Sequence, residues 1–143
     1  MSSARALASI VVGLACSGCQ PAPAAPDPVA PVRALLTGGS WRLVDYHPDL
    51  PLDPVTQALL ALQIHTMVVT FDGGTMHAAS PTVNFSRPYV VESPTAYSFD
   101  LVSPGIGGGY LRSHCEPTPD GRRMVFRAQT DPWTGTGVLE RDH

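Results

Sequence analysis

Histidine is the residue type in this sequence of 143 residues that is best suited to metal binding or acid–base catalysis. The sequence contains five of them, and no two show the His-x-x-x-His spacing that places two ligands on one helix face. His114 and Cys115 are neighbours, so on a strand they point to opposite faces and cannot hold one ion together. We therefore expect no metal site and no cofactor. The histidines are His47, His65, His77, His114 and His143.

Nucleophilic catalysis has equally little support in the sequence. There is no Gly-x-Ser-x-Gly motif, and Cys115 has no recognisable base partner. Aspartates such as Asp53 and Asp72 lie where turns or helix caps are expected, and the glycines of 105–109 are not followed by the Lys-Ser/Thr of a phosphate loop. We expect no catalytic residues, and hence a protein that is not an enzyme.

The first eighteen residues are typical of a secretory signal peptide. Arg5 supplies a positive charge, and residues 6–15 form an apolar run of ten that ends in small residues. Ten residues rise about 15 Å as a helix, which is half the thickness of a bilayer's hydrocarbon core. A signal peptide is therefore favoured over a membrane-spanning helix.

The segment Leu14-Ala-Cys-Ser-Gly-Cys19 resembles the lipobox of bacterial lipoproteins, in which small residues precede an acylated cysteine that becomes the mature N-terminus. Cys19 is favoured because Ser17 and Gly18 precede it, and Cys16 is the alternative. An ordinary signal peptide with incidental cysteines is the other interpretation. Acylation, by palmitate or a similar chain, anchors a domain because each buried CH₂ contributes about 0.8 kcal/mol.

Further implications of this resemblance concern location. The residue after Cys19 is Gln20. The usual signal for retention at the inner membrane, an Asp at this position, is therefore absent. The resemblance therefore implies an outer-membrane lipoprotein that faces the periplasm, with the membrane as its partner through the lipid anchor. With Cys19 acylated, Cys115 is left alone and is expected to be buried; with cleavage at Cys16, Cys19 is free to pair with Cys115.

Residues 19–34 are predicted to be a tether, because 20–31 (QPAPAAPDPVAP) contain five prolines and four alanines. Repeated proline favours an extended polyproline chain of about 3.1 Å per residue. Residues 35–143 are then one domain of ordinary size. The net charge of -3 and nine scattered arginines, with no lysine, exclude a nucleic-acid-binding surface.

The domain is predicted to be all-β, because short segments of alternating or β-branched residues are separated by Pro, Gly and Asp. Asp72-Gly73-Gly74 predicts a tight hairpin between two of them. Asp53 and Pro54 predict the start of one helix over 55–64, whose apolar residues need cover on more than one side. This helix is expected to plug a barrel end, to act as a lid or to meet a partner. The eight predicted strands are 40–46, 66–71, 75–79, 84–91, 97–102, 110–115, 123–129 and 137–141.

Alternation along the strands predicts an inward-facing set of side chains. The larger of these side chains favour a domain interior that is filled by the protein's own side chains. They are Trp41, Leu43, Met67, Phe71, Tyr97, Phe99, Met124 and Phe126, with Val69, Leu101 and Ala128 on the same faces.

Gly39-Ser40-Trp41 opens the first strand and Arg141 lies near the end of the last. In this the sequence resembles the calycins, and in particular the short lipocalin-like domains of bacterial lipoproteins. The resemblance implies a small up-and-down antiparallel β-barrel of about eight strands. It also implies that Gly39, Trp41 and Arg141 form a structural motif in which the basic side chain packs over the indole ring.

Two functions are expected from a barrel of this size. Eight strands leave an interior that holds one small ligand or is filled by side chains. The first hypothesis is a binding module for a small apolar ligand or lipid, with ligand-binding residues that the sequence leaves unassigned. The alternative is a non-enzymatic accessory or interaction protein of the cell envelope, whose protein partner the sequence does not specify.

Overall fold

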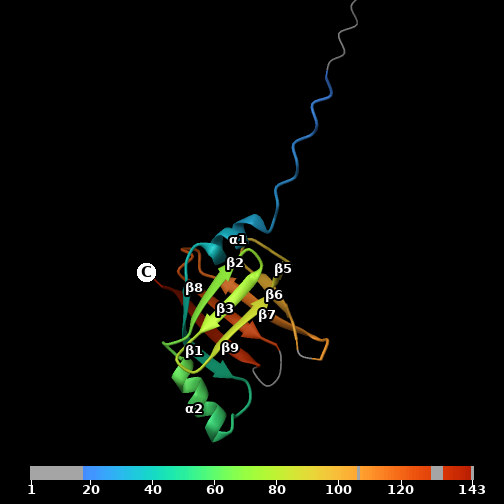
Figure 1. Ribbon diagram of the computed structural model, residues 1–143. Helices are drawn as coiled ribbons and strands as arrows, with labels where there is room; N and C mark the ends of the chain where they lie inside the picture. Colours follow the sequence, from blue (N-terminus) through green and yellow to red (C-terminus); the bar gives the residue numbers. More distant parts are fainter. Residues whose placement is uncertain (1–17, 106, 130–133, 143) are drawn as a thin grey trace, which may run out of the picture.

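The computed structural model describes residues 18–105, 107–129 and 134–142, and in these residues the chain forms a nearly closed antiparallel barrel with two helices (Figure 1). The all-β prediction is confirmed. The elements are α1 (Ala30–Thr37), β1 (Trp41–Pro48), α2 (Pro54–Gln63), β2 (Val68–Asp72), β3 (Thr75–Ala79), β4 (Asn84–Pro88), β5 (Val90–Glu92), β6 (Phe99–Pro104), β7 (Tyr110–Pro117), β8 (Arg123–Ala128) and β9 (Gly135–Arg141).

The strands follow an up-and-down order in which the last strand returns to the first. The sheet order is β4-β3-β2-β1-β9-β8-β7-β6-β5, and every pairing is antiparallel. Strands β1 and β9 pair from Trp41 opposite Arg141 to Pro48 opposite Gly135, with an irregularity between Leu43 and Asp45. This long pairing joins the first strand to the last and places Trp41 beside Arg141.

One predicted strand is divided in two. Residues 84–91 were expected to be continuous, but β4 pairs with β3 and β5 pairs with β6, with Tyr89 between them. Pro88 has no amide hydrogen, and the amide of Tyr89 donates to the carbonyl of Gly74 at 2.8 Å. The Tyr89 ring packs edge-on against Phe71, with ring centroids 5.4 Å apart. The chain therefore changes partners at Tyr89, which accounts for the ninth strand.

The predicted hairpin is confirmed. Asp72 pairs with Thr75, so Gly73 and Gly74 form a two-residue loop between β2 and β3. Gly74 has a φ of 147°, a conformation that residues with a side chain rarely adopt. The glycine at this position is therefore required by the turn.

Helix α2 begins where its sequence predicts. The Asp53 carboxylate accepts hydrogen bonds from the amides of Val55 and Thr56, each at 3.0 Å, and Pro54 occupies the first turn. The expectation that α2 plugs the barrel with its apolar face is wrong, since Val55 and Leu59 are exposed and the buried residue is Gln63. The Gln63 side chain donates to Thr82 at 2.6 Å and so fixes α2 to the loop that follows β3.

Helix α1 spans the boundary between the predicted tether and the domain. Pro31 fits the first turn, because the missing amide hydrogen is not needed there. Val32 and Leu36 are buried, and α1 packs against β2. Residues 18–28 are exposed and lead away from α1 (Figure 1), so every buried residue of the domain lies C-terminal to them. None of the helices in the described residues is long and apolar enough to cross a membrane.

The core contains most of the predicted inward-facing residues. Trp41, Leu43, Val69, Phe71, Phe99 and Met124 are buried, and Met67, Leu101 and Phe126 pack against them. Tyr97 is an error of prediction, because its side chain is 81% exposed. It lies in a turn in which Thr95 and Ser98 hydrogen-bond to each other, and β6 begins only at Phe99.

Candidate functional site

The structure brings Trp41 and Arg141 together at the barrel end covered by α1. The guanidinium carbon of Arg141 lies 4.8 Å from the centroid of the Trp41 ring, and Trp41 is fully buried. The Trp41 indole N–H donates to the carbonyl of Leu36 at 3.3 Å. The last turn of α1 is thereby tied to the first residue of β1.

Arg141 makes a second connection to the same helix. It donates to the carbonyls of Leu35 at 2.6 Å and Gly38 at 3.1 Å. These carbonyls belong to the last turn of α1, where the helix dipole favours a cation. A side chain at Gly38 would place its Cβ 2.8 Å from this guanidinium, whereas at Gly39 the nearest Arg141 atom would be 3.8 Å away. Close packing therefore requires glycine at Gly38 more than at the predicted Gly39.

The candidate lipidation residue Cys19 is exposed in the extended segment ahead of α1, and Cys16 lies outside the described residues. Cys19 and Cys115 are both free thiols, and Cys115 is buried. Burial, followed by the negative charge of Asp100, raises the pKa of the Cys115 thiol to about 12. A thiol in this state is neutral and unreactive at physiological pH.

The core of the domain contains several large side chains that are fully buried. The largest fully buried ones are Trp41, Phe99, Leu36, Met124 and Cys115. Two hollows lie at the surface of the described residues, and both are open to solvent.

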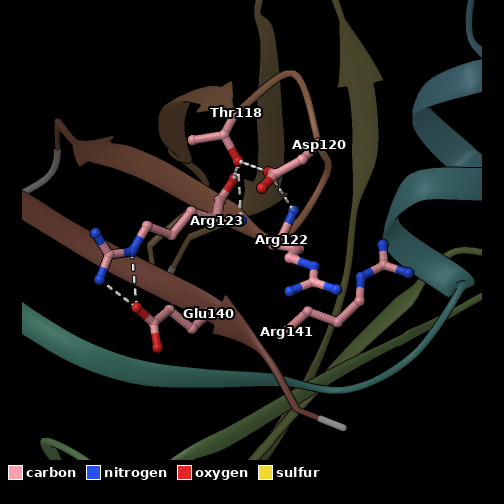
Figure 2. Close-up of a pocket in the computed structure, with 6 residues that line it drawn as sticks. All are labelled: Thr118, Asp120, Arg122, Arg123, Glu140 and Arg141. Atoms are coloured by element: carbon pink, nitrogen blue, oxygen red, sulfur yellow. Dashed lines mark hydrogen bonds and ion pairs between the residues drawn. The ribbon is translucent and has the colours of Figure 1, made fainter.

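One of these hollows, the basic hollow, has a volume of about 300 Å³ and includes Arg141 in its lining (Figure 2). It takes its lining from the turn between β7 and β8, from the start of β8 and from the end of β9. Three arginines and two carboxylates line it, so it retains one net positive charge. The residues are Thr118, Asp120, Arg122, Arg123, Glu140 and Arg141.

The other, the strand-break groove, has a volume of about 570 Å³ and follows the division between β4 and β5. Its apolar residues include the exposed Val90 and Tyr110 and the buried Val102. Arg112 lies at its polar side and pairs with Glu92 and Asp100, each at 2.8 Å. The groove therefore combines an apolar floor with a satisfied charge network.

Three of the histidines, His47, His77 and His114, take part in side-chain hydrogen bonds. Nδ1 of His77 lies 2.7 Å from the Ser86 hydroxyl and its Nε2 lies 3.0 Å from Asp72, on the outer face of β2, β3 and β4. This Ser-His-Asp chain lines neither of the two hollows. No group of three metal-ligating side chains occurs in the described ranges.

His114 lies 2.7 Å from Asp100 on the neighbouring strand. Hydrogen bonds from His114 and Arg112 keep the pKa of Asp100 below its ordinary value, and that from His114 has the larger effect. Asp100 is thus a structural anion shared by two basic groups.

Sequence reasoning missed two surface features. Arg122 and Tyr110 become notable only when the fold places them in the hollows, because nothing in their local sequence distinguishes them from ordinary surface residues. The sequence indicated that the apolar residues of α2 need cover, but not that Val55, Leu59 and Leu62 are left exposed.

Comparisons of this chain with protein-family models, with curated proteins and with solved structures give no significant match. The fold and the surface geometry therefore carry the functional argument.

Proposed function

We propose that this chain is a lipoprotein of the bacterial cell envelope that acts through the outside of its barrel, as a non-enzymatic accessory or interaction protein. Acyl chains on Cys19 would hold it at the outer membrane, facing the periplasm. The observation that carries the proposal is the tightly buried core, in which Trp41, Phe99 and Met124 are each at most 2% exposed.

The anchor is supported by the lipobox-like segment and by the exposure of Cys19 ahead of α1. Intact-mass analysis of the full chain from a membrane fraction should find acyl groups on a mature N-terminus at Cys19. Cys19→Ser should abolish acylation and membrane retention, while Cys16→Ser keeps both. The reverse result would assign the anchor to Cys16, and no effect of either change would reject the anchor.

A surface for a partner is available on α2. We name the exposed residues Leu50, Val55, Leu59 and Leu62 the α2 apolar face. Helices that lie on anionic membranes carry Lys or Arg beside their apolar residues, whereas α2 (PVTQALLALQ) has no charged residue. Helix α2 also lies at the opposite end of the barrel from α1 and the tether (Figure 1). A protein with an apolar surface therefore fits this face better than lipid.

Native mass spectrometry of the chain purified from its own host tests the filled barrel. A mass equal to that of the covalent protein supports the proposal. A mass excess that disappears on denaturation would contradict it.

An excess of the size of a small molecule, as opposed to that of a second protein chain, would favour the second candidate function, binding of a small apolar ligand. The strand-break groove supports this candidate, because its volume of about 570 Å³ is within the range of ligand pockets and its floor is apolar. Tyr110→Ser should then remove the excess mass. Leu59→Ser, on the α2 apolar face, is the matched control and should retain it.

A further inference from the structure

We propose that the basic hollow binds a phosphate group, either that of an anionic lipid headgroup or a free phosphate. Within the hollow, two of the three arginines have no carboxylate partner. Arg123 pairs with Glu140, at 2.7 Å from its Nε. Arg122 and Arg141 form no ion pair with a carboxylate among the described residues.

The two carboxylates of the lining are already engaged. Asp120 accepts hydrogen bonds from the Thr118 hydroxyl at 2.6 Å and from the backbone amide of Arg122 at 3.0 Å. These bonds keep the pKa of Asp120 below its ordinary value, so it remains an anion that shapes the turn. Glu140 is held by Arg123. Neither carboxylate is hydrogen-bonded to the Arg122 guanidinium.

Arg141 is held in place before any ligand arrives. Its terminal nitrogens are fixed by the carbonyls of Leu35 and Gly38, and its Nε is buried without a hydrogen-bond partner. Arg122 is exposed, and Figure 2 shows its side chain extending from the turn toward the same part of the hollow as Arg141. A fixed guanidinium beside an adjustable one suits an oxyanion, because the planar fork of arginine matches phosphate oxygens in pairs.

The position of the basic hollow is compatible with a phosphate that belongs to a lipid headgroup. Arg141 contacts the last turn of α1, and Leu35 of that helix lies beside Gly121 in the turn that carries Asp120 and Arg122. The basic hollow is thus beside α1, and the tether leads away from this helix (Figure 1). If Cys19 is acylated, this side of the domain is the one nearer the bilayer, where headgroup phosphates are concentrated. The phosphate site itself does not depend on the anchor.

The experiment uses the chain from Gln20 to His143, which contains every buried residue but no acylation site. Cooperative thermal unfolding first establishes that this chain is folded. Binding to inorganic phosphate is then measured by calorimetry. Binding to lipid is measured by co-sedimentation with phosphatidylcholine vesicles, which are neutral, and with vesicles that also contain phosphatidylglycerol at about one anionic lipid in three. Arg122→Gln removes a guanidinium that forms no ion pair with the carboxylates of the described residues. Arg87→Gln is the matched control, because Arg87 lies over the Phe85 ring on β4, away from the hollow.

Binding to inorganic phosphate that Arg122→Gln weakens about tenfold, the loss expected for one charge-assisted contact, supports a free-phosphate site. Binding that appears only with phosphatidylglycerol and is lost in Arg122→Gln supports a headgroup site. The proposal is overturned if neither probe binds, or if Arg87→Gln weakens binding as much as Arg122→Gln does.

Discussion

Trp41 and Arg141 are directly opposite each other in the pairing of β1 with β9, and the guanidinium carbon of Arg141 lies 4.8 Å from the centroid of the indole ring. This contact joins the first strand, the last strand and α1, because Arg141 also donates to two carbonyls at the end of that helix. The Arg141 side chain thus connects β1, β9 and α1 at this end of the barrel.

Arg141→Gln should therefore destabilise the domain by about 2 kcal/mol, since a cation–π contact and two charge-assisted hydrogen bonds are lost. Arg141→Lys keeps the charge but cannot bridge both carbonyls, so an intermediate loss is expected. Urea unfolding followed by circular dichroism measures both changes. Arg87→Gln removes an exposed arginine over Phe85, at 5.0 Å, and should cost less than about 1 kcal/mol. Equal losses for Arg141→Gln and Arg87→Gln would contradict the structural role of Arg141.

The sequence predicted those features that depend on local chemistry. Gly73 and Gly74 specify the β2–β3 turn, and Asp53 with Pro54 specifies the start of α2, because each signal acts within a few residues. Helix α1 was missed because the prolines around it indicate an extended chain, whereas its stability comes from tertiary contacts such as the burial of Val32 and Leu36.

Features that depend on the tertiary structure could not be predicted from the sequence. The break at Tyr89 is set by its hydrogen bond to Gly74 and its contact with Phe71, which lie far away in sequence. The basic hollow combines residues 118–123 with residues 140 and 141, so its composition is visible only after β8 and β9 have paired.

A second stability prediction concerns Gly135, where β9 begins beside the end of β1. A Cβ at this position would lie 2.5 Å from the carbonyl oxygen of His47 and 2.9 Å from Cα of Pro48. These neighbours are backbone atoms that cannot move independently, so Gly135→Ala should cost about 2 kcal/mol through overpacking. Gly73→Ala is the matched control, because a Cβ there meets nothing within 4 Å. Thermal unfolding of the two variants should separate them clearly, and similar midpoints would contradict the close packing of β1 and β9.

The reactivity of Cys115 gives a third prediction. Its pKa of about 12 lies above the unperturbed value of 9.0, so the folded protein holds this proton more tightly than the unfolded chain does. The contribution of Cys115 to stability is therefore fully present below pH 9 and is lost as the pH rises from 9 toward about 12. At pH 8, iodoacetamide should modify Cys115 of the folded protein only at the rate of unfolding. In about 6 M guanidinium, roughly the concentration that unfolds even very stable domains, Cys115 should be modified at once. Rapid modification under native conditions would contradict the buried, neutral thiol.

Leu36 and Leu59 allow a comparison of the same residue type at two positions with opposite roles. Leu36 of α1 is fully buried, so Leu36→Ala should cost about 3 kcal/mol, through lost burial and the cavity that remains. Leu59 of α2 is 45% exposed, and Leu59→Gln should change the free energy of unfolding by less than about 1 kcal/mol.

If the α2 apolar face binds a protein, Leu59→Gln should nevertheless release the chain from its complex. Native electrophoresis of solubilised envelopes should then show the variant at its own mass while the unaltered chain migrates in a larger species. Thr70→Gln, at an exposed position on β2 outside this face, is the control and should remain in the complex. A folded Leu59→Gln variant that stays in the complex would move the interaction surface away from α2. If the unaltered chain also migrates at its own mass, it has no protein partner, and this result would contradict the proposed function.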